Sequence, residues 1–140
     1  MLSKTGIHAI RAMMSLAELP DGVYAGAGSI ADVIHAPRNY LGKLLQTLSR
    51  VGLVESQKGL GGGFRLAMDP RKITLLDIVD PIEHIGRLSG CFLGGSTCSE
   101  NKPCAIHQRW GKVRDQYIQL LKETTIADLI QDGKSIPESG

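Results

Sequence analysis

The chain has 140 residues, a formal net charge of +2 and a 42% share of hydrophobic residues. This size and composition predict one folded domain, with or without an attached dimerisation element, and exclude general disorder. The small net charge does not indicate nucleic-acid binding by itself, so only a local basic patch could do so.

No membrane or secreted location is expected. No apolar run reaches the ~18 residues that a membrane helix needs. Arg11 interrupts the apolar part of the N-terminal stretch, which therefore lacks a signal-peptide core. We expect a cytoplasmic protein with no membrane partner.

The first predicted helix spans residues 3–19, where apolar side chains recur at helical spacing. Ser3 or Thr5 could cap it. The sequence Leu-Pro-Asp-Gly at 19–22 ends it with turn-forming residues.

Two shorter helices follow. Ser29 is predicted to cap the first, with Asp32 as its capping-box partner, and His-Ala-Pro at 35–37 breaks it. Asn39 is predicted to cap the second, which ends at Gly52. The buried stripe of that second helix consists of Leu41, Leu44, Leu45, Leu48 and Val51. A short helix, a tight break and a longer helix are typical of a helix-turn-helix.

A two-stranded hairpin is predicted next. Residues 53–54 and 64–66 are short strand candidates on either side of a glycine-rich tip at 59–63, and Asp69-Pro70 closes the unit. A hairpin directly after a helix-turn-helix indicates a wing.

The remaining elements are helical. A helix opens at residues 73–79, where Thr74 and Asp77 have capping-box spacing, and Pro81 is expected to kink or end it. A long helix follows Pro103, and its apolar residues recur at alternating steps of four and three, as in a dimerising coiled coil. These residues are Ile106, Trp110, Val113, Tyr117, Leu120 and Leu121. Residues 125–130 form a closing helix that starts with Thr-x-x-Asp.

The expected architecture is mainly α with a small β-wing, a winged helix-turn-helix domain joined to a long dimerisation helix. The predicted boundaries place the DNA-binding domain at 1–80 and a linker with a cysteine-rich loop at 81–104. The dimerisation and closing helices occupy 105–130, and a polar, flexible tail occupies 131–140.

A recognition helix must present polar groups near its N-terminus to base edges in the major groove. The predicted DNA-contacting residues lie on that helix, on the wing and before the first helix: Lys4, Arg38, Asn39, Tyr40, Lys43, Arg50, Lys58, Gly59 and Arg65. Arginine and lysine contact guanine or phosphate, asparagine pairs with adenine, and glycine lets the backbone approach closely. The alternative is that these charges only cover a solvated surface.

All three cysteines lie on one loop. Six residues separate Cys91 from Cys98, five separate Cys98 from Cys104, and His107 follows three positions after Cys104. Clustered thiolates on a glycine-rich loop indicate a soft metal centre, and an odd number would leave one thiol outside a disulfide framework. His107 is the nearest fourth ligand, and His8 is another candidate.

Four interpretations of this loop stay open. An iron–sulfur cluster of two or four irons takes thiolates and, in some cases, histidine. Zinc usually binds more closely spaced cysteine pairs. A metal-free thiol switch would use exposed cysteines near Lys102, and inert free cysteines are the last alternative.

Taken together, these residues resemble the Rrf-two family of bacterial winged-helix regulators, which includes the iron–sulfur sensors IscR, NsrR and RirA. The resemblance lies in residues 3–17, 29–67, 73–83 and 125–130 and in the cysteine loop, in that order. It implies a homodimer, most often a repressor, that binds a palindromic double-stranded operator. It also implies that an iron–sulfur cluster controls the DNA affinity.

The resemblance also assigns residues. The family's DNA contacts fall on Asn39, Tyr40, Lys43, Lys58 and Gly59, and its cluster ligands on Cys91, Cys98, Cys104 and His107. The chain departs from the family at three points. Six residues separate Cys91 from Cys98, where IscR and NsrR have five. Gly42 stands where IscR has an acidic residue that helps to select operators. Ile7 stands where NsrR-type proteins have an aspartate that can bind the cluster.

We therefore expect a transcriptional regulator that senses iron or cluster status, redox state or nitric oxide. The alternative is a cluster-free winged-helix regulator that responds to thiol oxidation or zinc. An enzyme is not expected, because the sequence has no paired carboxylates or nucleophile elbow, and the glycine run lacks the Lys-Ser/Thr ending of a phosphate-binding loop.

Overall fold

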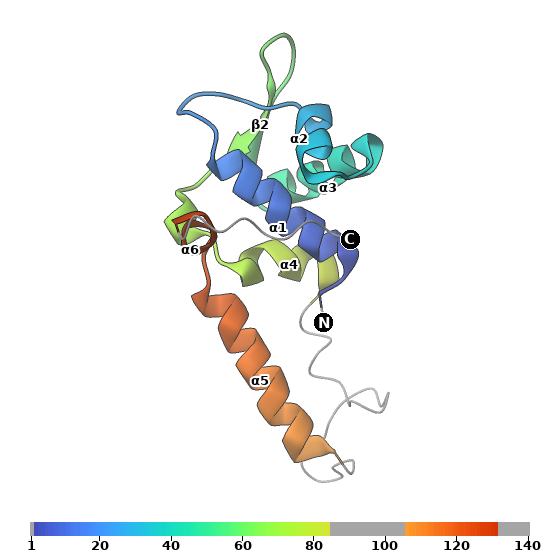
Figure 1. The fold of residues 1–140 in the computed structure, drawn as a ribbon, viewed down its shortest axis with the longest axis vertical. Coiled ribbons are helices and arrows are strands. Elements are labelled where there is room, and N and C mark those ends of the chain that lie inside the picture. Colours follow the sequence, from blue (N-terminus) through green and yellow to red (C-terminus); the bar gives the residue numbers. More distant parts are fainter. Residues whose placement is uncertain (1, 85–105, 132–140) are drawn as a thin grey trace.

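The computed structural model describes residues 2–84 and 106–131, which are mostly helical (Figure 1). The elements are α1 (Lys4–Ala17), α2 (Ala27–Ile34), α3 (Arg38–Arg50), β1 (Val54–Gln57), β2 (Gly63–Leu66), η1 (Pro70–Lys72), α4 (Leu75–Glu83), α5 (His107–Glu123) and α6 (Ile126–Gln131). The predicted fold class, mainly α with a small two-stranded wing, is confirmed. Nowhere in the described ranges does a helix combine the length and apolar character needed to cross a bilayer.

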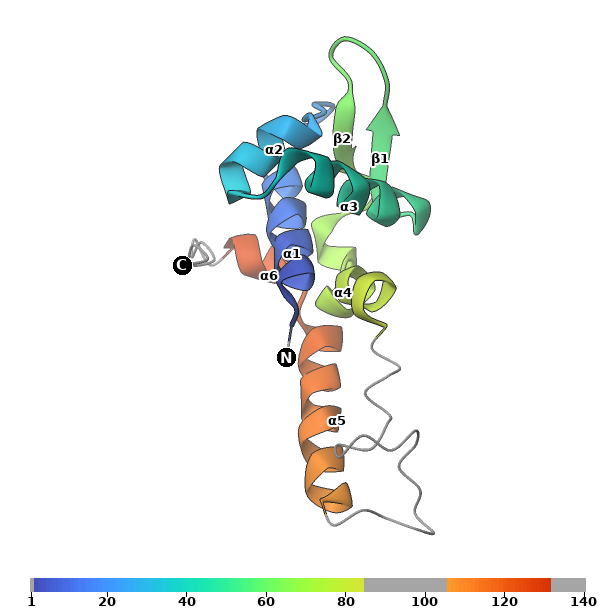
Figure 2. The same ribbon diagram turned by 90° about the vertical axis from the view of Figure 1, so that its right-hand side faces the viewer.

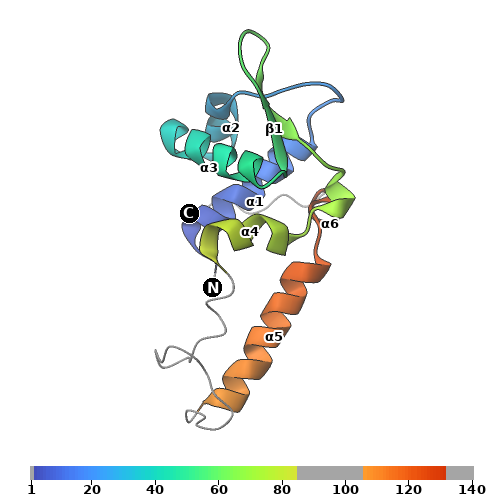
Figure 3. The same cartoon turned by 180° about the vertical axis from the view of Figure 1, so that it is seen from behind.

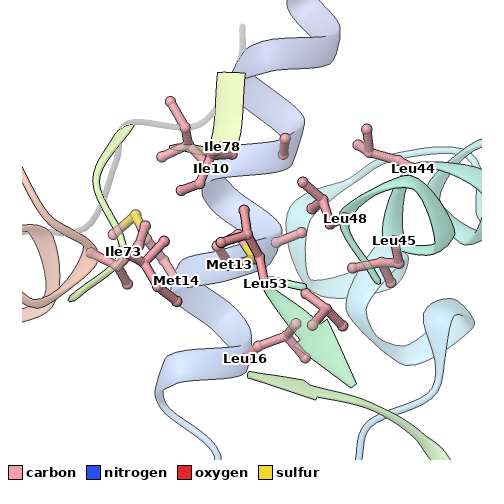
Figure 4. Close-up of a cluster of buried hydrophobic side chains, with 14 of the residues drawn as sticks. Ile10, Met13, Met14, Leu16, Leu44, Leu45, Leu48, Leu53, Ile73 and Ile78 are labelled. Carbon is pink, nitrogen blue, oxygen red and sulfur yellow. The ribbon is translucent and has the colours of Figure 1, made fainter. Parts of the chain in front are cut away.

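Helix α1 forms the centre of the fold and packs against α2, α3, α4, α6 and β2. Ser3 caps it as predicted, because its hydroxyl accepts a hydrogen bond from the Gly6 N–H at 3.1 Å. Met13 is fully buried, and Figure 4 shows Leu48 of α3 and Leu53 beside it. Burial of this apolar face, rather than helix propensity, is what stabilises such a short helix.

The helix-turn-helix is formed by α2 and α3, but two predicted caps are wrong. α2 begins at Ala27 after Gly26, so Ser29 lies inside the helix. α3 begins at Arg38 directly after Pro37, so Asn39 is already helical. Pro37 has an extended ψ of 134° and a φ of −63°, and it lets the helix start at once without a side-chain cap.

The leucine stripe of α3 was predicted correctly except at its end. Leu41, Leu44, Leu45 and Leu48 are buried, whereas Val51 is 49% exposed. Val51 is the C-cap residue of α3, beyond the last turn that faces the core. Gly52 follows with a φ of +86°, the left-handed conformation that ends helices and suits glycine.

The wing is an antiparallel pair in which Val54 lies opposite Leu66 and Gln57 opposite Gly63. It projects beyond the helices, as Figure 2 shows. Phe64 also exchanges two backbone hydrogen bonds with Ala25, with N···O distances of 2.7 and 2.9 Å, and this ties the α1–α2 loop to β2. Gly63 has a φ of +136°, and a Cβ there would collide with the Ala25 carbonyl.

Reciprocal capping boxes start α4 and α6, as predicted. Thr74 and Asp77 exchange side-chain and backbone hydrogen bonds at 3.0 and 3.1 Å. Thr125 and Asp128 do the same at 2.9 and 3.1 Å. Pro81 lies inside α4 and does not end it.

Helix α5 extends away from the rest of the described chain (Figures 1 and 3) and is anchored near its C-terminal end, where Leu121 is buried. The chain then returns through α6 to α1. Ile126 N–H donates to the Ile73 carbonyl at 3.0 Å, and Ile126 is fully buried. The segment that joins α4 to α5 carries the cysteines and lies outside the described residues.

Candidate nucleic-acid interface

The outer face of α3 carries a stripe of polar side chains. Asn39, Lys43, Gln46 and Arg50 are all exposed. Their spacing of four, three and four residues places them on one side of the helix, opposite the buried leucines. This is the arrangement that a recognition helix needs in the major groove.

Arg38 fixes the turn between α2 and α3. Its guanidinium binds the carboxylate of Asp32 with N···O distances of 2.7 and 3.3 Å. That hydrogen bond and the negative charge of Asp32 raise the pKa of Arg38. Asp32 was predicted to complete a cap with Ser29, but it joins α2 to α3 through Arg38 instead. The charge of Arg38 is therefore already partly neutralised by Asp32.

Arg65 lies within the wing and not at its tip. Its Nε donates to Glu55 on the opposite strand at 2.9 Å, and its guanidinium lies 4.5 Å from the centre of the Tyr24 ring. Arg65 thus braces the α1–α2 loop against the sheet.

The tip of the wing presents Lys58, Gly59, Leu60 and Gly61, all exposed. Gly59 and Gly61 have φ values of +91° and +77°, a conformation that glycine adopts without strain. Leu60 is fully exposed between them. Sequence analysis missed Leu60 as a tip residue, although it is the one apolar side chain in the run 58–63.

Tyr40 faces inward at the start of α3. Its hydroxyl oxygen lies 3.4 Å from Nδ1 of His8 on α1, and the two rings meet edge to face, 5.5 Å apart at 73°. Tyr40 is half-buried and packs on the core, so its hydroxyl points toward α1. Sequence analysis missed this pair because 32 residues separate its members.

His8 is only 5% exposed. Burial lowers its pKa below the usual 6.5, and the positive charges of Lys4 and Arg11 lower it further. The neutral imidazole can therefore exchange a hydrogen bond with Tyr40. Lys4, a predicted DNA contact, is exposed in the first turn of α1, one turn before His8.

The predicted metal ligands lie mostly outside the described residues. This holds for Cys91, Cys98 and Cys104, and of His107 only the backbone is described, as the first residue of α5. Within residues 2–84 and 106–131, no three histidine, cysteine, aspartate or glutamate side chains come together to hold a metal. As a donor set, three thiolates and one imidazole suit an iron–sulfur cluster.

The predicted seam of α5 is partly exposed in the described structure. Val113 and Leu120 are 50% and 57% exposed, whereas Leu121 is buried. Tyr117 is half-buried, and its hydroxyl has no hydrogen-bond partner among the described residues. Burial raises the pKa of Tyr117, and the charge of Glu83 adds to the shift.

A helix-turn-helix with an exposed polar stripe and a glycine-tipped wing defines a winged-helix DNA-binding protein. More narrowly, the chain belongs to the Rrf2 (Rrf-two) family, described as iron-dependent transcriptional regulators, which it matches over residues 2–132. This confirms the resemblance seen in the sequence. The chain is therefore a DNA-binding transcriptional regulator.

Similar proteins support this assignment. An HTH-type transcriptional regulator of Aquifex aeolicus is 41% identical over 103 residues, which cover 72% of each chain. The structure of CymR (YrzC), the global cysteine regulator of B. subtilis, matches with a TM-score of 0.79 and 29% identity over 94% of this chain and 97% of that chain. IscR of T. potens matches with a TM-score of 0.77 and 27% identity over 99% of this chain and 93% of that chain.

Proposed function

We propose that this chain is a homodimeric repressor that binds a palindromic operator in the cytoplasm and senses iron–sulfur cluster status through its cysteine loop. The observation that carries the DNA-binding part is the exposed stripe of α3 beside the wing. The sensing part is supported by the donor set of Cys91, Cys98, Cys104 and His107. A regulator of this kind needs no catalytic activity.

The described residues suggest separate roles in the complex. Asn39, near the start of α3, reads base edges in the major groove, and Lys43, one turn further along, binds phosphate. Arg50, at the other end of α3, binds phosphate. At the wing tip, Lys58 and Gly59 approach the backbone or the minor groove. Most of the DNA affinity that such basic side chains contribute comes from counterion release, so it falls as the salt concentration rises.

Four more side chains have supporting roles. Arg38 and Arg65, each already bound to a carboxylate, orient the turn and the wing and add phosphate contacts. Lys4 adds another phosphate contact from α1. Because the hydroxyl of Tyr40 faces His8, we propose that Tyr40 contacts DNA only through the exposed part of its ring.

The exposed apolar face of α5 supports the proposed dimer. Val113 and Leu120 are large apolar side chains exposed on a helix that projects from the body. Pairing α5 with a second copy covers them, and a two-fold axis places two recognition helices on two half-sites of a palindrome. A tenfold change in operator affinity then needs only about 1.4 kcal/mol of differential binding between two dimer states.

Two sensing chemistries remain candidates. Cysteine thiolates, with His107 as fourth ligand, would hold a cluster, which supplies a centre sensitive to oxidants, nitric oxide and iron supply. The similarity to IscR favours this proposal. The similarity to a structure described as a global cysteine regulator keeps a cluster-free thiol response as the second candidate.

The test is anaerobic purification of the wild type and of Cys98→Ala, with Ser96→Ala as a matched control in the same loop. Visible absorption, iron and acid-labile sulfide are measured, together with operator affinity before and after oxidation. A coloured wild type and control, with a bleached Cys98→Ala variant, would support a cluster sensor.

A colourless, iron-free wild type after attempted reconstitution would exclude the cluster. If its operator affinity still responded to oxidant or zinc chelator, the second candidate would stand. A wild type that fails to bind any operator would overturn the proposal as a whole.

A further inference from the structure

The first turn of the recognition helix is held by side chains of other helices. α3 starts directly after Pro37 and has no side-chain cap. On its outer side, Arg38 binds Asp32 of α2. On its inner side, the ring of Tyr40 lies against His8 of α1. Together with the buried side chain of Leu41, these two contacts orient the first turn, where base contacts are expected.

His8 is unusual in its surroundings. Among the described residues it is the buried polar side chain in a core that is otherwise aliphatic, with neighbours such as Ala9 and Ile10 in the same helix. A buried polar group without a partner is costly. The Tyr40 hydroxyl, 3.4 Å from Nδ1, is the partner that His8 has in the structure. An aliphatic residue would fill this position as well, so packing alone does not account for an imidazole here.

The start of α1 is held by the end of α4. The carboxylate of Glu83 accepts a hydrogen bond from the Ser3 N–H at 2.6 Å and another from the Ser3 hydroxyl. A Cβ at Gly6 would collide with this carboxylate, so glycine leaves room for it. A negative charge at a helix N-terminus also matches the helix dipole.

Glu83 is the last residue of α4, and the segment that carries the three cysteines begins shortly after it. α1 is thus attached near its start to the point where the cysteine segment leaves α4. Little more than one helical turn further along, it contacts the recognition helix through His8. α1 is thus the rigid element that joins the contact at Ser3 to the contact at Tyr40.

We propose that His8 is a positioning residue for the recognition helix, and that the Glu83–Ser3 and His8–Tyr40 contacts make α1 the connection between the cysteine segment and the operator surface. This inference rests on the proposed operator binding and cysteine sensing. A displacement of the α4 end shifts the first turn of α1, and His8 passes that shift to Tyr40 and the start of α3.

The first experiment is a double-mutant cycle on operator affinity. His8→Phe keeps a buried ring and removes both nitrogens, and Tyr40→Phe removes only the hydroxyl. Each variant should raise the operator Kd about twofold to tenfold, the range expected for one neutral hydrogen bond. The double variant should be no weaker than the weaker single variant, because both remove the same contact. Additive effects, or single effects below twofold, would overturn the inference.

A second readout needs no DNA. Amide hydrogen exchange in the first turns of α3 should be faster in His8→Phe and in Tyr40→Phe than in the wild type. Ile10→Val is the control, because it removes one methyl group from another buried residue of α1. If the control accelerated exchange in α3 equally, His8 would have only a packing role and the inference would fail.

The coupling is tested with Glu83→Gln, which keeps the shape of the side chain and removes its charge. In this variant the ratio of operator affinities before and after cysteine oxidation should move toward one. The Kd of the reduced protein should change less than this ratio does. An unchanged ratio would show that Glu83 does not couple the cysteine segment to the operator surface. A wild type without operator binding would contradict the proposed function, while the exchange measurement would still decide the role of His8.

Discussion

Lys43 is exposed in the middle of the α3 face that we propose enters the major groove. Lys43→Ala should weaken binding to all DNA sequences and reduce the slope of log Kd against log salt concentration by about one, because one phosphate contact is lost. Fluorescence anisotropy at several salt concentrations measures this slope. Lys122→Ala, which removes an exposed charge from α5, is the control and should leave the slope unchanged. Equal slopes for the two variants would place Lys43 outside the interface.

His8 should make the stability of the fold depend on pH. Its pKa lies below the usual 6.5 in the folded chain, because burial and the charges of Lys4 and Arg11 disfavour the imidazolium. Between the two pKa values the unfolded chain binds more protons, so the free energy of unfolding rises with pH and this contribution is complete above 6.5.

The stability difference between wild type and His8→Gln should therefore shrink as the pH falls from about 7.5 to about 5.5. Urea unfolding followed by circular dichroism measures it. His35→Asn is the matched control, because His35 is exposed at the end of α2 in a left-handed conformation that asparagine tolerates. A pH dependence that is the same in wild type and His8→Gln would show that His8 does not cause it.

At the scale of single elements, the two Thr-x-x-Asp caps allow a matched comparison. Thr74→Ala and Thr125→Ala should each reduce the free energy of unfolding by about 1 kcal/mol, because each leaves a helix N–H without its partner. Ser29→Ala should change it by less than about 0.5 kcal/mol, since Ser29 lies inside α2. Chemical denaturation of the three variants tests both statements, and a large loss at Ser29 would contradict the observed start of α2.

The wing depends on the backbone of Gly63. Gly63→Ala should destabilise the fold by at least about 1 kcal/mol, because a Cβ collides with the Ala25 carbonyl at a positive φ. Gly26→Ala is the control, because nothing lies near its added Cβ. Thermal unfolding of both variants gives the difference. Similar midpoints would mean that the Ala25–Phe64 contact does not contribute to the stability of the fold.

The sequence was sufficient to predict most of the elements, because their signals are local. The Thr74 and Thr125 caps, the leucine stripe of α3 and the glycine-rich hairpin all depend on residues a few positions apart. The failed caps at Ser29 and Asn39 depended on competition, since Asp32 binds Arg38 and Pro37 starts α3 earlier.

Most of the candidate site could also be located from the sequence, but not its internal contacts. The exposed stripe from Asn39 to Arg50 follows from helical spacing. The inward turn of Tyr40 and the bond between Arg65 and Glu55 do not, because each depends on how separate elements pack. No local pattern could reveal that Glu83 holds the start of α1.

At the scale of the whole molecule, α5 should decide the oligomeric state. Val113→Asp places a charge on the exposed apolar face of α5 and should convert the proposed dimer to a monomer, because a desolvated carboxylate is costly at an interface. Analytical ultracentrifugation measures this change. Gln119→Asp adds the same charge at an exposed polar position on another side of α5 and should leave the proposed dimer intact. A dimeric Val113→Asp variant would exclude this face from the interface.

The return of α6 onto α1 has a consequence for biosynthesis. During translation α1 leaves the ribosome early, but Ile126 and Thr125, which cover it and bond to the segment 73–74, follow only after the cysteine segment. Domains reach their full packing when all parts have been made. A nascent chain therefore completes the packing around α1 only after all three cysteines have been synthesised.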